Sequence, residues 1–157
     1  MNFDIATDHF ALTARNDLIR TLLGDKLGDG VSRQVFRLAF RPDLVVKVED
    51  RSQHFQNAME WEVWRTVAGT PWAKWFAPCE EISPCGCVLI QHATVPLRDG
   101  ELPDQLPNFF TDLKPGNFGR IGKQIVAHDY AINLLLNRGL SSARIAKVAK
   151  HRWSPDK

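Results

Sequence analysis

Apolar positions in this chain follow a helical period in two segments and a strand period in several shorter ones. Leucine and isoleucine recur at helical spacing over residues 11–23, which predicts a helix that ends at Gly24. A second helix is predicted over residues 52–68, before a Gly-Thr-Pro sequence. Short apolar runs predict three pairs of strands, which lie on both sides of residues 41–43, within residues 79–90, and between Phe118 and Val126.

The C-terminal part has a weaker pattern that favours helix. Residues 103–110 are expected to form a short helix, and residues 131–150 are expected to be mostly helical. Gly139 is the expected break, with Ser141 as the N-cap of the last segment. That segment would carry a basic stripe, which we interpret as a solvated face, with binding of an anionic partner as the alternative: Arg144, Lys147, Lys150, His151 and Arg152.

The strongest chemical signal is the sequence Thr-Asp-Leu-Lys-Pro-Gly-Asn at residues 111–117, followed by His-Asp-Tyr at residues 128–130. Phosphoryl transfer needs a base for the acceptor hydroxyl, a cation near the transferred phosphate and oxygen ligands for Mg²⁺. Asp112, Lys114 and Asn117 supply these groups in one loop, and Asp129 adds a second carboxylate after a short apolar run.

A second set of residues, earlier in the chain, suits a nucleotide. Gly28 and Gly30 let the backbone approach a polyphosphate, and Val35 is placed to pack on the base. Arg33 lies between them, and two interpretations stay open: its guanidinium bonds a phosphate, or it points outward. Lys47 interrupts a run of apolar residues, a costly position unless phosphate and a carboxylate use its charge.

The carboxylate partner of Lys47 is expected on the following helix. Glu60 is favoured because Trp64 and Val67 follow it on the same helical face, and Glu62 is the alternative. Glu49, which comes soon after the lysine, is expected to be a surface charge, as is the neighbouring aspartate at position 50.

These motifs, in this order, resemble those of the protein kinases, and the short chain is similar to the miniature kinase-like proteins of bacteriophages. The resemblance covers roughly residues 24–131 and implies an α+β fold. Residues 1–92 would form a small N-lobe with an N-terminal helix, an antiparallel sheet and one key helix. Residues 93–157 would form a strongly truncated helical C-lobe, without an activation segment or the helices that bind protein substrates.

The resemblance also implies ATP and Mg²⁺ as cofactors and assigns roles to individual residues. The implied assignments are catalysis by Asp112 and Lys114, metal binding by Asn117 and Asp129, and nucleotide binding by Gly28, Gly30, Val35, Lys47, Glu60 and, at the adenine hinge, Gln91 and Ala93. The first functional hypothesis is a phosphotransferase that acts on a protein or small-molecule hydroxyl. The second is a nucleotide-binding pseudokinase that regulates a host or partner protein, and the third is an interaction protein that binds no nucleotide.

Composition limits the partners and the location. The formal net charge of +2 argues against a dedicated nucleic-acid binder, and no apolar run approaches the length of a membrane span. One domain in the cytoplasm is expected, which would be the host cytoplasm if a phage encodes the chain.

The cysteine and tryptophan residues leave two further alternatives open. A zinc site could be built from Cys79, Cys85, Cys87 and His92, but the spacing lacks a C-x-x-C knuckle, so buried or hairpin thiols are favoured. Four tryptophans are expected to pack around the second helix rather than stack on bases, with Trp61 as a candidate partner contact: Trp61, Trp64, Trp72 and Trp75.

Overall fold

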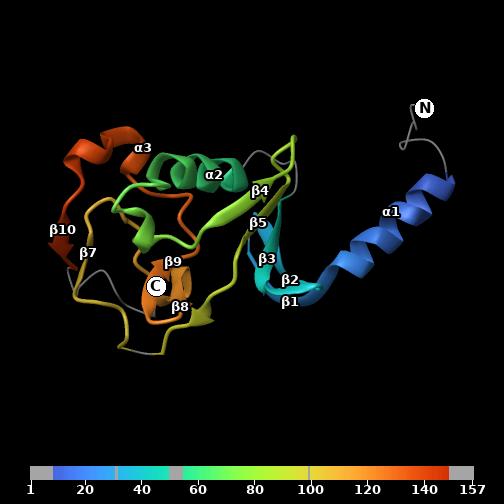
Figure 1. Cartoon of the computed structure of the whole chain (residues 1–157), viewed down its shortest axis with the longest axis horizontal. Coiled ribbons are helices and arrows are strands. Elements are labelled where there is room, and N and C mark those ends of the chain that lie inside the picture. Colours follow the sequence, from blue (N-terminus) through green and yellow to red (C-terminus); the bar gives the residue numbers. More distant parts are fainter. Residues whose placement is uncertain (1–8, 31, 50–54, 99, 149–157) are drawn as a thin grey trace.

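The computed structural model describes residues 9–30, 32–49, 55–98 and 100–148. Within these ranges the chain is an α+β fold with three α-helices and three antiparallel sheets (Figure 1). The α+β class and the mostly antiparallel pairing agree with the expectation from the sequence.

The largest sheet has five strands in the order β1-β2-β3-β5-β4. These strands are β1 (Leu23–Asp29), β2 (Arg33–Leu38), β3 (Arg41–Glu49), β4 (Cys79–Ile82) and β5 (Val88–His92). β3 lies at the centre, and four successive residues of it, Leu44 to Lys47, are buried. The two predicted strands β2 and β3 and the hairpin over residues 79–90 are confirmed, but the turn between β2 and β3 lies at residues 39–40, and residues 41–43 belong to β3.

Helix α2 (Gln56–Val67) packs against β3, β4 and β5. Its buried side chains include Val63 and Val67, which are fully inaccessible and recur at the spacing of one helical face. The prediction of a helix here is confirmed, although residues 52–54 of the predicted range lie outside the described residues.

A three-stranded sheet follows the large one along the chain. It consists of β6 (Val95–Pro96), β8 (Phe118–Ile121) and β9 (Gln124–Ala127), in the order β6-β8-β9. The β8–β9 hairpin is the one predicted from the sequence, and a 3₁₀ turn at Pro115–Asn117 leads into it.

The described C-terminal part is not the helical lobe that the sequence predicted. Residues 103–110 contain the strand β7 (Gln105–Pro107), and after residue 130 the only α-helix in the described range is α3 (Leu135–Arg138). The 3₁₀ turn Leu140–Ser142 and strand β10 (Ile145–Lys147) follow it. Antiparallel pairing of β10 with β7 overrides the helical pattern, because each strand satisfies backbone groups of the other.

The side chain of Asn133 explains why the chain does not enter a helix directly after residue 130. Its amide nitrogen donates to the carbonyl of Tyr130 (2.5 Å), and its oxygen accepts from the backbone of Leu135 (2.7 Å). Such local bonds compete with helix formation. Arg144 and Lys147 therefore lie beside or on a strand rather than on a basic helix, and residues 150–152 of the predicted stripe lie outside the described residues.

An aromatic core joins the first half of the described chain, up to residue 92, to the second half, from residue 93 onward. Phe76 lies 5.5 Å from the ring of Phe109 and 5.0 Å from that of Tyr130, and all three are buried. The four tryptophans pack against this core, as the sequence predicted: Trp61, Trp64, Trp72 and Trp75. Residues from both halves therefore share one hydrophobic core.

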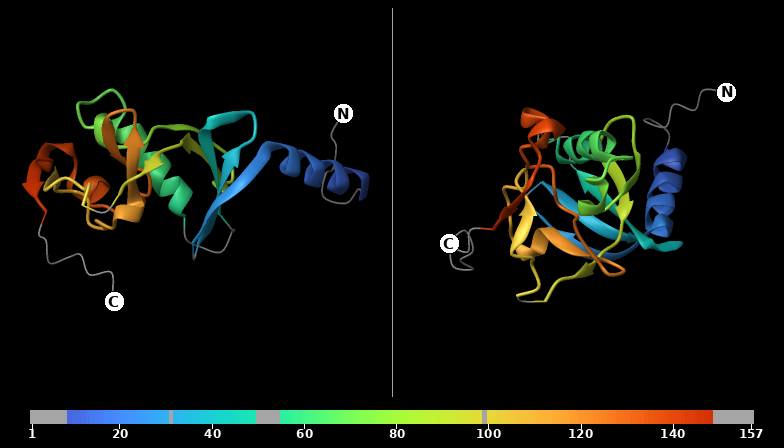
Figure 2. Two further views of the ribbon diagram at one scale, coloured as in Figure 1. Left: turned by 90° about the horizontal axis from the view of Figure 1, so that it is seen from below. Right: turned by 60° about the vertical axis from the view of Figure 1, so that its left-hand side comes forward.

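Helix α1 (His9–Leu22) confirms the predicted N-terminal helix and extends away from the rest of the molecule (Figures 1 and 2). Leu18 and Ile19 on this helix are exposed. No helix in the described part of the chain combines the length and the apolar character that crossing a membrane requires.

Candidate active site

Strand register places three charged side chains on the face of the large sheet that α2 covers. Arg33 of β2 lies opposite Glu49 of β3, and Val35 lies opposite Lys47. Residues two apart on a strand share a face, as do directly paired residues, so Arg33, Lys47 and Glu49 all point to the same side.

Lys47 and Glu60 form the predicted ion pair. The lysine Nζ lies 2.6 Å from Oε2 of Glu60, and the two side chains are 4% and 0% exposed. The alternative, Glu62, is exposed and pairs with Arg65 at 3.4 Å. The amphipathic pattern of the helix therefore selected the correct glutamate.

Glu49 holds the start of α2 and is not the surface charge that the sequence predicted. Its carboxylate accepts the backbone N–H groups of Gln56 (2.9 Å) and Asn57 (2.8 Å), and the residue is 6% exposed. The first N–H groups of a helix have no partner within the helix, so a nearby carboxylate stabilises them. The side chain of Asn57 also donates to the carbonyl of Lys47 (3.2 Å), which fixes α2 against β3.

Arg33 points inward and contacts two carboxylates. Its Nη2 lies 2.6 Å from Oε1 of Glu60 and 2.8 Å from Oδ1 of Asp129, and its side chain is 7% exposed. The outward-pointing interpretation is therefore wrong, and bonding of a phosphate by Arg33 stays a prediction. Arg33, Lys47, Glu60 and Asp129 together form what we call the four-charge cluster.

Burial and mutual attraction oppose each other within the four-charge cluster. For Glu60, burial favours a higher pKa, but the charges of Lys47 and Arg33 outweigh it and hold the pKa below its usual value. Burial lowers the pKa of Lys47, against the pull of Glu60. For Asp129, burial raises the pKa although Arg33 opposes the change.

The loop that carries Asp129 is tied to the cluster through backbone groups on both sides of it. Lys47 donates to the carbonyl of His128, and the N–H of Tyr130 donates to Oε1 of Glu60 at 3.1 Å. Motif spacing does not indicate these backbone contacts. They attach the segment after β9 directly to α2 and β3.

The ring of His128 is a structural part of this loop. It lies 2.8 Å from the hydroxyl of Thr94 and 2.8 Å from the carbonyl of Gly116. Burial lowers the pKa of His128 to about 4, and the charge of Lys47 acts in the same direction. The ring is therefore neutral at pH 7, donating to the Gly116 carbonyl and accepting from Thr94.

Asn117 connects the loop of residues 111–117 to Asp129. The backbone N–H groups of His128 (2.9 Å) and Asp129 (3.2 Å) both donate to its carbonyl, and its side-chain nitrogen donates to the carbonyl of Asp112 (3.0 Å). The backbones of the two predicted metal ligands, Asn117 and Asp129, therefore lie side by side.

Asp112 and Lys114 are on the outer side of this loop. Their side chains are 37% and 76% exposed and lie 3.5 Å apart. Among the described residues, no hydrogen bond or ion pair links either side chain to the four-charge cluster. The structure thus brings together Lys47, Glu60 and Asp129, with Asp112 and Lys114 in the adjoining exposed loop.

The two glycines of the predicted phosphate loop lie at the β1–β2 hairpin. A Cβ on Gly28 would meet only Val35, at 3.9 to 4.0 Å, which is ordinary van der Waals contact. A Cβ on Gly30 would lie 3.3 Å from the carbonyl of Arg33. Folding alone therefore does not demand glycine at position 28, and close approach of a phosphate to it stays a prediction.

The predicted adenine hinge has its backbone N–H groups in use. Ala93 donates to the carbonyl of Asp43 (2.8 Å), and His92 donates to that of Pro78 (2.8 Å). Gln91 is fully buried, and its side-chain oxygen has no hydrogen-bond partner among the residues that the structure describes. Contact of Gln91 and Ala93 with adenine stays a prediction, and the N–H of Ala93 would have to leave Asp43 to make it.

The donor groups at Asn117 and Asp129 suit Mg²⁺ only in part. Among the described residues there is no cluster of three or more His, Cys, Asp or Glu side chains that could hold a metal ion. Mg²⁺ commonly takes one or two protein oxygens and completes its shell with phosphate and water. The side-chain oxygen of Asn117 and Oδ2 of Asp129 could supply these two, while Arg33 occupies Oδ1 of Asp129.

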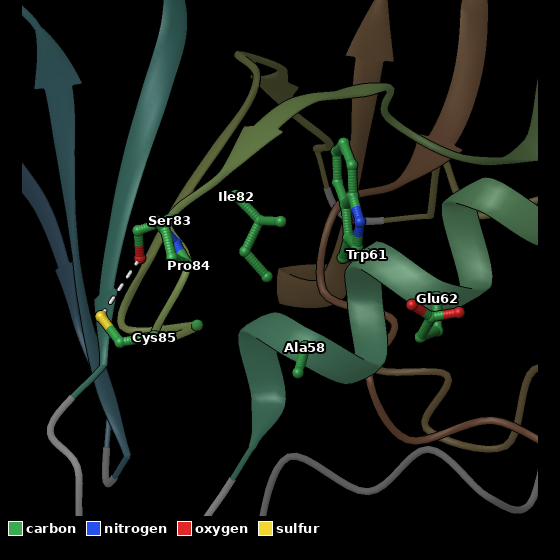
Figure 3. Close-up of a pocket in the computed structure, with 8 residues that line it drawn as sticks. Ala58, Trp61, Glu62, Ile82, Ser83, Pro84 and Cys85 are labelled. Atoms are coloured by element: carbon green, nitrogen blue, oxygen red, sulfur yellow. Dashed lines mark hydrogen bonds between the residues drawn. The ribbon is translucent and has the colours of Figure 1, made fainter.

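A hollow of about 400 Å³ lies elsewhere, between α2 and the β4–β5 turn (Figure 3). Trp61 and Glu62 line it from the helix, and Pro84 and Cys85 line it from the turn. The Cys85 thiol lies 3.5 Å from the hydroxyl of Ser83. This hollow shares no residue with the four-charge cluster.

Comparisons with known proteins add no family. No protein-family model, curated protein or solved structure matches this chain. The resemblance to kinases therefore depends on the sequence motifs already described.

Proposed function

We propose that this chain is a kinase-like phosphotransferase that uses ATP and Mg²⁺ and acts on a hydroxyl group of a protein or a small molecule. The buried ion pair between Lys47 and Glu60 is the observation that supports it most. The same lysine donates to the carbonyl of the residue before Asp129. A lysine for phosphate, its glutamate partner and a carboxylate for metal are thus held together, as phosphoryl transfer requires.

Five of the predicted residues have a role in binding Mg²⁺ and the nucleotide. Lys47 binds the phosphates, and Gly28 leaves room for them beside Val35, which packs on the base. Asn117 and Asp129 would hold Mg²⁺, and the ion would supply positive charge beside the phosphates.

The transfer step itself uses the exposed loop. Asp112 accepts the proton of the acceptor hydroxyl while that oxygen forms a bond to the γ-phosphorus of ATP. The bond between the γ-phosphorus and the bridging oxygen breaks, and ADP leaves with the electron pair. Lys114 stabilises the charge on the transferring group. The exposure of Asp112 and Lys114 suits an acceptor that approaches from solvent.

A nucleotide-binding pseudokinase that regulates a host or partner protein is the second candidate. Two contacts favour it: Arg33 occupies a carboxylate oxygen of Asp129, and the N–H of Ala93 is bonded to Asp43. In this case the chain binds a nucleotide and transfers no phosphate.

Titration with ATP, with and without Mg²⁺, tests the proposed site. Asp129→Asn should weaken binding of ATP in the presence of Mg²⁺ by about tenfold or more, because a hard cation needs carboxylate charge. Asp25→Asn, which removes a carboxylate from an exposed position on β1, is the matched control and should bind as the parent does. Unchanged Mg²⁺-ATP affinity in Asp129→Asn would rule out the metal assignment. Labelled phosphate transfer then separates the enzyme from the pseudokinase.

A further inference from the structure

Arg33 stands at the position of the third glycine in the motif that the kinase resemblance supplies. The structure gives it contacts that no glycine could make. Its guanidinium joins Glu60 of α2 to Asp129 of the loop after β9, and Oδ1 of Asn57 lies 3.4 Å from its Nη1. The register of β2 against β3 aims the side chain at this point, since Arg33 pairs with the buried Glu49.

The charges of the four-charge cluster balance without any added ion. Lys47 and Arg33 contribute two positive charges, and Glu60 and Asp129 contribute two negative charges. Lys47 alone would neutralise Glu60. Arg33 lies between Glu60 and Asp129 and is the cation paired with Asp129, so a divalent ion added beside that carboxylate would meet a like charge at short range.

We infer that Arg33 is a resident cation that competes with a divalent metal for the carboxylate of Asp129. This inference rests on the proposed function only in taking Asp129 as the metal ligand. Metal alone binds weakly, because Arg33 at Oδ1 already neutralises the carboxylate and repels a cation that approaches Oδ2. Nucleotide phosphates supply the guanidinium with a new anionic partner, so metal and nucleotide bind together more strongly than either binds alone.

The test uses Mn²⁺ as a paramagnetic substitute for Mg²⁺. Its binding to the protein is measured by electron paramagnetic resonance in the absence of nucleotide. Arg33→Gln should bind Mn²⁺ at least about tenfold more tightly than the parent, because one positive charge leaves hydrogen-bond distance of Asp129. The double variant Arg33→Gln with Asp129→Asn should lose this gain.

Arg41→Gln is the matched control. It removes one positive charge from the same sheet, where Arg41 forms a bidentate pair with Asp43 (2.9 and 2.7 Å), but at an exposed position. It should leave Mn²⁺ binding unchanged. If Arg33→Gln binds Mn²⁺ no more tightly than Arg41→Gln, the inference is wrong.

A measurement on the unaltered protein covers the case in which Arg33→Gln does not fold. The affinity of the protein for Mn²⁺ should rise at least about tenfold when a non-hydrolysable ATP analogue is present. The Mn²⁺ that the analogue binds in free solution is subtracted first. Equal Mn²⁺ affinity of the protein with and without the analogue overturns the inference. A chain that shows the predicted metal behaviour and transfers no phosphate keeps the role of Arg33 and loses the proposed enzyme activity.

Discussion

Glu60 is the residue on which the charged interior depends. It accepts hydrogen bonds from Lys47, Arg33 and the backbone of Tyr130, and its side chain is fully buried. Replacing one member of a buried ion pair is far more costly than replacing both, because the remaining charge keeps its desolvation penalty without its partner.

Glu60→Gln should therefore lower the free energy of unfolding by about 3–5 kcal/mol, since it leaves the buried Lys47 without a carboxylate and Arg33 with Asp129 alone. Glu62→Gln, two residues away on the solvent side of the same helix, should change it by less than about 0.5 kcal/mol. Urea unfolding followed by tryptophan fluorescence measures both. Similar losses in the two variants would contradict the assigned pairing.

The cysteines differ in reactivity because their surroundings differ. Cys85 is exposed, and hydrogen bonding from Ser83, with the neighbouring Cys87, lowers the pKa of its thiol to about 7. Cys79 is buried against the hydroxyl of Tyr130 (3.0 Å), and burial raises the pKa of its thiol to about 11. The thiolate is the reactive form, so the reaction rates of Cys85 and Cys79 should depend differently on pH.

Alkylation by iodoacetamide, followed by peptide mass spectrometry, should show this separation. A lowered pKa means that the thiolate forms at lower pH, so the rate at Cys85 should rise to a half-maximum near pH 7 and level off above it. Cys79 should stay unmodified at pH 8 in the folded protein. Ser83→Ala should move the midpoint for Cys85 upward. A midpoint near pH 9 in the parent would contradict the role of Ser83.

At the scale of elements, the contact between β6 and β8 requires a glycine. A Cβ on Gly119 would lie 2.3 Å from the hydroxyl of Thr94 and 2.9 Å from the carbonyl of Val95. Thr94 is also the residue that bonds the ring of His128. Any side chain at position 119 would therefore push β6 away from β8 and disturb the loop before Asp129.

Gly119→Ala should accordingly lower the free energy of unfolding by about 1–3 kcal/mol, as overpacked sites do. Gly116→Ala is the control, because a Cβ there has open space around it. Thermal unfolding measures both variants. Equal melting temperatures for the parent and Gly119→Ala would mean that β6 does not press on β8 as the structure has it.

The elements that the sequence predicted correctly are those in which local preference and tertiary packing agree. The β-branched run of β3 and the apolar face of α2 become the core contacts that their patterns indicate. The helices predicted in the C-terminal part were wrong because local preference and tertiary packing disagree there. The pairing of β10 with β7 joins segments far apart in the chain, and a local helical period carries no information about such a partner.

The candidate site divides in the same way. Motif spacing was enough to find Lys47 and Glu60, because the strand and helix that carry them are regular. The inward position of Arg33 could have been found from strand alternation, since it is two residues before Val35, which pairs with Lys47. The backbone contacts of His128 and Tyr130 could not, because they depend on how the β8–β9 hairpin docks against α2.

On the scale of the whole molecule, the four-charge cluster connects the two halves of the chain. Arg33, Lys47 and Glu60 come from the large sheet and its helix, whereas Asp129 follows the second sheet. The shared aromatic core lies next to this cluster. Tyr130 connects the two, because its ring belongs to the core and its backbone N–H donates to Glu60. A ligand that binds the cluster therefore contacts both halves, and its binding should stabilise the whole fold against unfolding.

Nucleotide binding and phosphate transfer should be separable by substitution, because Lys47 and Asp112 lie in different parts of the site. Lys47 is buried in the cluster, whereas Asp112 lies in the exposed loop with no side-chain bond to it among the described residues. Asp112→Ala should lower the rate of phosphate transfer by about 10²-fold or more, as loss of a general base does, and leave ATP affinity nearly unchanged. Lys47→Met should weaken ATP binding as well.

The measurements are transfer of labelled phosphate to the chain itself or to candidate acceptors, and calorimetric titration with ATP. Asp25→Ala, which removes an exposed carboxylate from β1, is the control for Asp112→Ala and should transfer at the rate of the parent. Transfer by Asp112→Ala at the parent rate would show that another group activates the acceptor. If the parent binds Mg²⁺-ATP but transfers no phosphate, the pseudokinase hypothesis replaces the enzyme hypothesis. This outcome is possible because nucleotide binding depends on the buried cluster, whereas transfer depends on the exposed loop.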